Sequence, residues 1–168
     1  MPTASLLDTA FADLDTELET TRRVLDRVPY DEHADWKPHE KSMSLGALAR
    51  HVAGLPKMAV ITLSTDELDL AGARPPSDPV ESREDLLAVW DQNVTALRAA
   101  LSGADDDTLS ATWALRHGEH TISVDPRHLV IRRWALSHIA HHRGQLTVYL
   151  RLLDVPVPSV YGPTADER

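Results

Sequence analysis

The chain has 168 residues, of which 42% are hydrophobic and 26% are charged, and its formal net charge is −9. This length and composition predict a single globular domain over residues 1–168. The negative charge argues against nucleic acid or an anionic membrane as a partner, because both reward a basic surface. There is no cysteine, which excludes disulfides and protein thiolates. No apolar run reaches the length of a membrane span and no signal-peptide pattern opens the chain, so a cytoplasmic location is expected.

Two amphipathic helices are predicted in the N-terminal part of the chain from their hydrophobic periodicity. The first runs from about Ser5 to Val28. The second begins near Ser44, a residue type suited to capping a helix, and ends near Leu63. Pro56 lies inside this second helix and predicts a kink, because proline removes a backbone hydrogen bond.

Two more helices are predicted in the C-terminal half. The third begins at Ser82, where Asp85 completes a capping box, and ends near Leu101. The fourth begins at Asp125–Pro126, with the aspartate as N-cap and the proline in the first helical position. It continues to about Leu153.

The segment Thr112 to Val124 alternates weakly in polarity around His117–Gly118, which predicts a small hairpin between the third and fourth helices. Four long amphipathic helices predict an all-α fold, a four-helix bundle. The connecting loops are long for such a bundle, and we expect them to shape the mouth of a pocket.

Helical geometry places three histidines on hydrophobic helix faces. On the fourth helix His138 and His142 lie about 40° apart among apolar residues, whereas Arg143 lies more than about 100° from His138. On the second helix His51 shares a face with Leu48 and other apolar residues. The first and third helices have no ionisable residue at the centre of their apolar faces. We therefore expect a core with three histidines and no carboxylate, which excludes a di-iron carboxylate site.

Three inward histidines from two helices are typical of a metal site. His138 and His142 are four residues apart, so their side chains start about 5–6 Å apart and can share one ion. His51 would complete a set of three ligands and leave a position open for water or substrate, as in catalytic zinc sites. Imidazole also suits nickel, copper and iron. The alternative is that these are core histidines, each of which would need a buried polar partner.

Two further residues of the fourth helix are candidates for catalysis. His141 points about 60° away from the centre of the histidine face, as expected of an edge residue that assists the site. Tyr149 lies on the inward side two turns beyond His142. It is either a packing residue whose hydroxyl reaches a carbonyl, or a group that contacts substrate or a metal ligand.

Two motifs make the chain resemble a known family. The stretch WKPHEKSMSLGALARHVAGLP (residues 36–56) resembles the second-helix signature of the DinB/YfiT-like metalloenzymes, and HIAHHRGQL (residues 138–146) resembles their fourth-helix signature. Residues 149–163 resemble the C-terminal end of that family. The resemblance implies a four-helix bundle, often a homodimer, with a divalent metal on His51, His138 and His142.

The resemblance also implies candidate functions. Some members are transferases or isomerases that use a low-molecular-weight thiol such as bacillithiol or mycothiol, so we expect zinc or nickel to activate such a thiol toward a small-molecule substrate. The absence of a predicted inward carboxylate base favours thiol activation over the alternative, a metal-dependent hydrolase. A second alternative is a stress-response protein that binds metal without turnover, in which the ion only links two helices.

Overall fold

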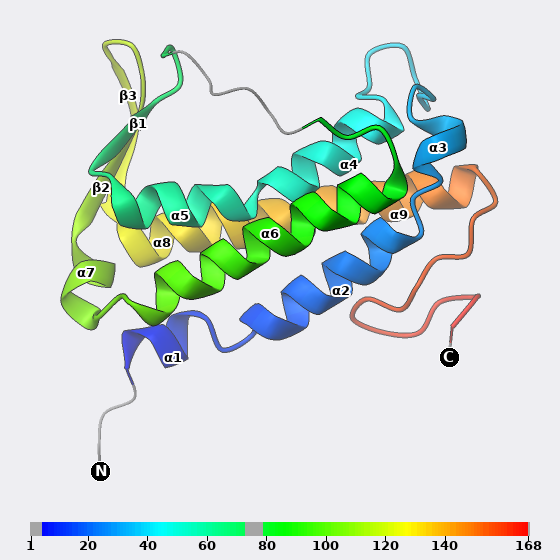
Figure 1. Ribbon diagram of the computed structural model, residues 1–168. Coiled ribbons are helices and arrows are strands. Elements are labelled where there is room, and N and C mark those ends of the chain that lie inside the picture. Colours follow the sequence, from blue (N-terminus) through cyan, green and yellow to red (C-terminus); the bar gives the residue numbers. More distant parts are fainter. Residues whose placement is uncertain (1–4, 73–78, 168) are drawn as a thin grey trace.

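The computed structural model describes residues 5–72 and 79–167, and Figure 1 shows its elements. In chain order these are α1 (Leu6–Ala10), α2 (Leu14–Asp26), α3 (Tyr30–His33), α4 (Leu45–Gly54), α5 (Pro56–Ser64), β1 (Glu67–Asp69), α6 (Arg83–Ser102), α7 (Asp106–Ser110), β2 (Thr112–His117), β3 (His120–Pro126), α8 (Arg127–Ile131), the π-helix η1 (Arg132–Ser137) and α9 (His138–Leu152). Within these ranges no helix combines the length and the hydrophobicity that a membrane span requires.

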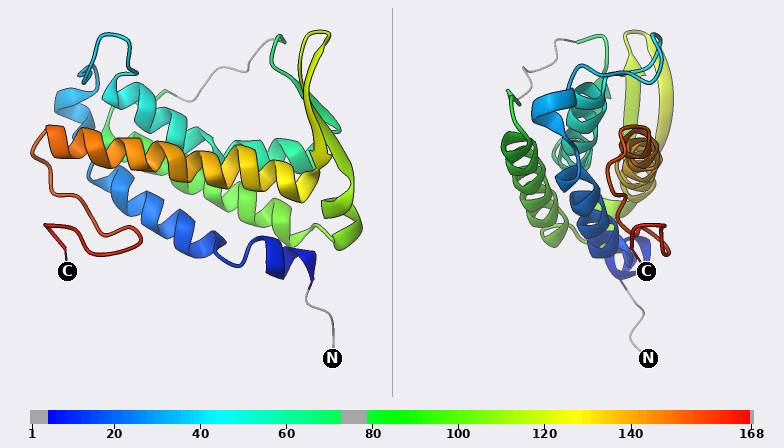
Figure 2. Two further views of the ribbon diagram at one scale, coloured as in Figure 1. Left: turned by 180° about the vertical axis from the view of Figure 1, so that it is seen from behind. Right: turned by 90° about the vertical axis from the view of Figure 1, so that its right-hand side faces the viewer.

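Long helical rods make up most of the molecule, and a small sheet lies at one end. The rods α2, α4–α5, α6 and α8–η1–α9 lie side by side, as both views in Figure 2 show. Hydrophobic side chains from all of them form one core, which includes Leu18, Leu48, Trp90 and Leu146. The prediction of a mainly helical chain is thus confirmed, but the all-α class is incomplete, because the predicted hairpin is part of a three-stranded sheet.

The predicted helix starts in the N-terminal half are confirmed by their caps. Ser5 and Ser44 each accept a hydrogen bond from the backbone N–H three residues later, at 3.1 and 3.2 Å. Pro56 breaks the second helix into α4 and α5, as expected of a residue that cannot donate to the preceding turn. The first helix is not continuous, contrary to prediction. It breaks between α1 and α2, where Phe11 turns into the core and is 6% exposed.

The sheet joins segments that are distant in sequence. The predicted hairpin is confirmed as β2 and β3, which pair antiparallel, with Gly118 in the turn at φ +59°. Strand β1, which was not predicted, pairs parallel to β2. The fourth helix begins at Arg127, later than predicted, because Asp125 and Pro126 still pair with β2. The predicted capping role of Asp125 is therefore wrong. The third helix starts with the predicted capping box of Ser82 and Asp85.

The fourth rod changes its helical geometry immediately before the first histidine of the motif. Residues of η1 follow the wider π-helical turn, and α9 begins at His138. The buried residues of α9 are Ile139, Arg143, Leu146 and Leu150. The centre of the buried face therefore lies about 100° from His138. The prediction that His138 and His142 occupy that centre is wrong, because they lie at its edge and are half-buried.

Arg143 departs most from the sequence prediction, since its side chain is only 1% exposed. Its Nη2 atom donates to the Glu17 Oε2 atom at 2.8 Å, and its Nη1 atom donates to the Thr21 hydroxyl at 3.1 Å. The Tyr161 hydroxyl accepts a hydrogen bond from Arg143 at 2.6 Å and donates to Glu17 at 3.0 Å. Burial first, and then the hydrogen bond to Glu17, raise the pKa of Tyr161. The core thus contains a carboxylate and a guanidinium, contrary to expectation.

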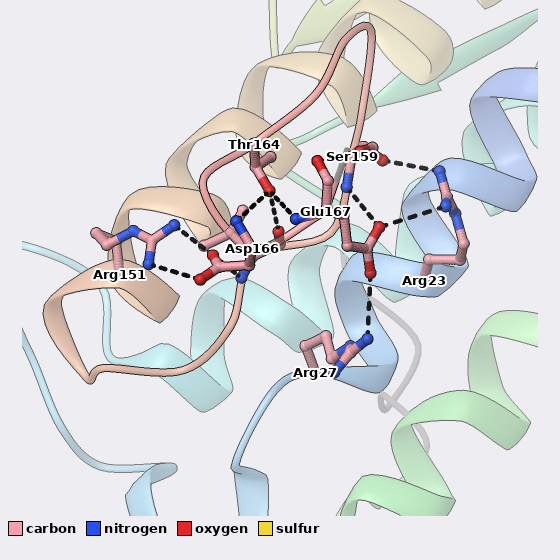
Figure 3. A network of polar contacts seen from close by, with 8 residues as sticks. Arg23, Arg27, Arg151, Ser159, Thr164, Asp166 and Glu167 are labelled. Carbon is pink, nitrogen blue, oxygen red and sulfur yellow. Dashed lines mark hydrogen bonds and ion pairs between the residues drawn. The ribbon is translucent and has the colours of Figure 1, made fainter.

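The segment after α9 is fastened back onto the helices by a polar network (Figure 3). Asp166 pairs with Arg151 near the end of α9, and its carboxylate accepts from the Val157 backbone N–H at 2.9 Å. Glu167 accepts a hydrogen bond at 3.2 Å from Arg27, the residue that follows α2. The same segment carries Tyr161, which is 75% exposed and whose ring lies over the guanidinium of the buried Arg143 at 5.0 Å.

Candidate metal centre

The structure brings together the three histidines that the sequence predicted as metal ligands. His51 lies in the last turn of α4, and His138 and His142 lie in the first turns of α9. One ring nitrogen from each lies within 4.8 Å of the other two. The Nε2 atom of His138 lies 3.4 Å from that of His51 and 2.9 Å from that of His142. The three imidazoles thus point toward one another where α4 packs against α9.

Hydrogen bonds on the outer sides of two rings orient them toward this point. The Nδ1 atom of His142 lies 2.7 Å from the Gln145 Oε1 atom, an acceptor, so Nδ1 carries the proton. His138 donates to the backbone carbonyl of Trp134, four residues earlier in η1. The Nε2 atoms of both rings therefore present lone pairs to each other at 2.9 Å. Facing lone pairs repel, and a cation between them removes that repulsion.

His51 and His138 are neutral at neutral pH, as metal ligands must be. Burial, followed by the nearby His142 and His138, lowers the pKa of His51 to about 4. Burial is also the main reason that the pKa of His138 is lowered, followed by its proximity to His142. A cation that binds here at pH 7 therefore has no proton to displace from His51.

The arrangement fits a divalent transition metal. Zinc binds imidazole nitrogen at about 2.0–2.1 Å, and tetrahedral angles then separate two such nitrogens by about 3.3 Å. The separations of 3.4 and 2.9 Å between Nε2 atoms are close to this value. The three rings are half-buried, which leaves room on the open side for a fourth ligand. His51, His138 and His142 would hold such an ion.

The two predicted catalytic residues occupy different positions relative to these histidines. His141 is exposed beside them, with its ring centroid 4.7 Å from that of His142. Its Nε2 atom accepts a hydrogen bond from the Gln145 amide at 3.1 Å. Tyr149 lies two turns further along α9, where its hydroxyl donates to the Met43 carbonyl at 3.2 Å and its ring contacts Trp36. Gln145 thus joins His141 to His142, whereas Tyr149 holds the connection before α4.

The sequence did not reveal which residues surround the histidines. A pocket of about 450 Å³ opens beside His51 and His138, and it is lined by residues of α4, α5, β1, β2 and η1. Strand β1 is only three residues long, too short to show a hydrophobic period. For Gln145 a signal exists, because it follows His142 by three residues and so shares a helix face with it.

Replacing Gln145 with leucine is expected to weaken metal binding by about 10–100-fold, since the hydrogen bond that orients His142 is lost. Isothermal titration of the metal-free protein with zinc measures the change. Gln92→Leu is the matched control, because Gln92 is exposed on α6, which contributes no histidine to the cluster. Equal affinities of the Gln145→Leu and Gln92→Leu variants would show that this hydrogen bond has no role in binding.

Comparisons with known proteins agree with this architecture. The sequence profile of the DinB family matches residues 1–168. The uncharacterized protein YrdA of Bacillus subtilis (strain 168) is 27% identical over 153 residues, which cover 90% of this chain and 85% of YrdA.

Two solved structures share the fold. A DinB-like protein from Bacillus cereus ATCC 10987 superposes with a TM-score of 0.70 at 22% identity, over 92% of this chain and 97% of that one. The DinB-like protein YjoA from Bacillus subtilis gives a TM-score of 0.65 at 16% identity, over 95% and 99% of the two chains. Together with the match over the whole sequence, these likenesses lead to one conclusion: the chain belongs to the DinB family.

Proposed function

We propose that this protein binds one divalent cation, zinc or nickel, through His51, His138 and His142, and that it transfers a low-molecular-weight thiol to a small electrophilic substrate. The observation that carries the proposal is the convergence of three ring nitrogens within 4.8 Å beside an apolar pocket. We also propose that the four helical rods form a four-helix bundle and that the protein acts as a homodimer.

The residues around the site would have separate roles in metal binding and in substrate binding. When bound, a divalent cation supplies Lewis acidity, which lowers the pKa of a thiol at its open position. Gln145 keeps the Nδ1 atom of His142 protonated and thereby keeps Nε2 available for binding. The apolar walls of the pocket hold the acceptor.

In this proposal His141 accepts the proton of the thiol at its Nε2 atom, which in the resting site accepts from Gln145. A sulfur–carbon bond forms at the electrophilic carbon, and the bond from that carbon to its leaving group breaks with its electron pair. The proton passes from His141 to solvent, since this side chain is exposed. We assign Tyr149 an assisting role through the connection that its hydroxyl holds at Met43.

The test is an assay of the zinc- and nickel-loaded protein with a panel of low-molecular-weight thiols and chromogenic electrophiles. Conjugation is expected to depend on the metal and to disappear in the His142→Ala variant. Reduced turnover with unchanged metal content is expected for His141→Ala and Tyr149→Phe. Conjugation that survives chelation would overturn the proposal. Ester or amide cleavage without added thiol would favour the hydrolase, and a loaded protein inactive in both assays would favour a non-catalytic metal site.

A further inference from the structure

We propose that the apolar pocket beside the three histidines binds a small carboxylate with an apolar body, and that this molecule is the acceptor substrate. The assignment of this molecule as the acceptor rests on the proposed function. The binding itself depends only on the pocket, so binding and transfer can be tested separately.

The size and walls of the pocket fit the apolar part of such a molecule. Its volume of about 450 Å³ is within the range of small-molecule sites. Apolar side chains from three directions face it, from α5 (Met58, Ile61), from the sheet (Leu68, Leu115) and from η1 (Trp134). His51 and His138 line the same pocket, so a molecule within it lies against the proposed metal site.

The charge around the pocket is opposite to that of the whole chain. The chain has 26 acidic residues against 17 lysines and arginines, yet the described residues that line this pocket include Arg50 and Lys57 and no acidic residue. Arg50 is exposed and makes no ion pair or side-chain hydrogen bond among residues 5–72 and 79–167. A guanidinium beside apolar walls favours a carboxylate, which it binds through paired hydrogen bonds.

The position of Arg50 determines where the carboxylate of the ligand lies. Arg50 precedes His51 in the chain, and Gly54 follows one turn later on the same side of α4. A ligand carboxylate on Arg50 therefore leaves its apolar body to extend along α5 toward Met58 and Ile61. His51 and His138 line the pocket between these two ends, so such a ligand would lie beside the histidines.

Gly54 offers a way to fill the pocket without disturbing the fold. It lines the pocket, and a Cβ atom built there meets no other atom within 4 Å. A leucine at this position therefore extends into the space where the ligand would lie. Gly144 provides the matched control. A Cβ atom there also meets nothing within 4 Å, and this exposed residue of α9 lies outside the pocket.

The experiment measures binding of 2-naphthoate, 2-naphthamide and 2-naphthylmethylammonium by isothermal titration, first to the protein as purified and then after removal of metal by a chelator. The three probes share one apolar body and differ in charge. We expect 2-naphthoate to bind about tenfold more tightly than the neutral amide, and the cation to bind least. This order should persist after chelation, which separates recognition by Arg50 from direct coordination of the carboxylate to a metal.

Two variants decide the outcome. Arg50→Gln is expected to reduce 2-naphthoate affinity about tenfold and leave 2-naphthamide unchanged, and Gly54→Leu is expected to abolish binding of both, unlike Gly144→Leu. Equal affinity for acid and amide, or binding unaffected by Gly54→Leu in a protein with an unchanged circular dichroism spectrum, would overturn the inference. If these probes bind as expected but no thiol is transferred, the proposed function fails and the binding site stands.

Discussion

Replacement of His51 with alanine is expected to weaken zinc or nickel binding by at least about 100-fold, a larger loss than for any outer residue. The physical reason is that His51 is the only ligand in the cluster that comes from α4. Without it the ion keeps two imidazoles from adjacent turns of one helix, which do not complete a closed site. Elemental analysis of the purified protein should give one ion per chain for the wild type and none for the variant.

The His51→Ala substitution should also abolish the rise in Tm that zinc or nickel causes in the wild-type protein. A ligand that binds only the folded state at 100 times its Kd adds about 2.7 kcal/mol to the free energy of unfolding, and in a chain of this size that raises Tm by about 5–10 °C. The His51→Ala variant should show no such rise. His33→Ala is the control, because His33 is exposed and lies outside the cluster. An equal zinc-dependent rise in the His51→Ala variant would rule out the proposed site.

The histidine cluster could be predicted because it depends on short-range geometry. The spacing of His138 and His142 puts them on adjacent turns of any helix, and this relation holds wherever the helix is placed in the fold. His51 needed one further step, its position on the apolar face of a second helix. Capping residues such as Ser44 and Ser82 are predictable for the same reason, since each cap involves only the next few residues.

The rest of the site could not be predicted because it depends on packing between distant segments. Strand β1 exists only through its pairing with β2, which lies nearly fifty residues later in the chain. The burial of Arg143 depends on α2 and on Tyr161, neither of which is near it in sequence. Helical angles measured from His138 assigned Arg143 to the solvent, because they identify a polar face but not which neighbouring helix will cover it.

Loss of the charge on Glu17 is expected to have the largest effect on stability. Glu17→Gln conserves shape but leaves the Arg143 guanidinium, 1% exposed, without its counter-ion. Removing one partner of a buried ion pair costs about 3–5 kcal/mol, because the remaining charge stays out of water. Tm should then fall by about 6–20 °C. The control is Asp91→Asn, which breaks the exposed pair between Arg22 and Asp91 and should cost about 1 kcal/mol or less.

A double-mutant cycle distinguishes a true pair from two separate packing contributions. Arg143→Met alone leaves the Glu17 carboxylate with the Tyr161 hydroxyl as its remaining side-chain partner. Combining it with Glu17→Gln removes both charges, so the double variant should be less destabilised than the sum of the two single variants. Urea denaturation of the four proteins, all in metal-free form, measures this difference in the free energy of unfolding. Additive losses would show that burial of Arg143 and Glu17 does not depend on their mutual attraction, and that packing against Tyr161 and Thr21 holds them in place.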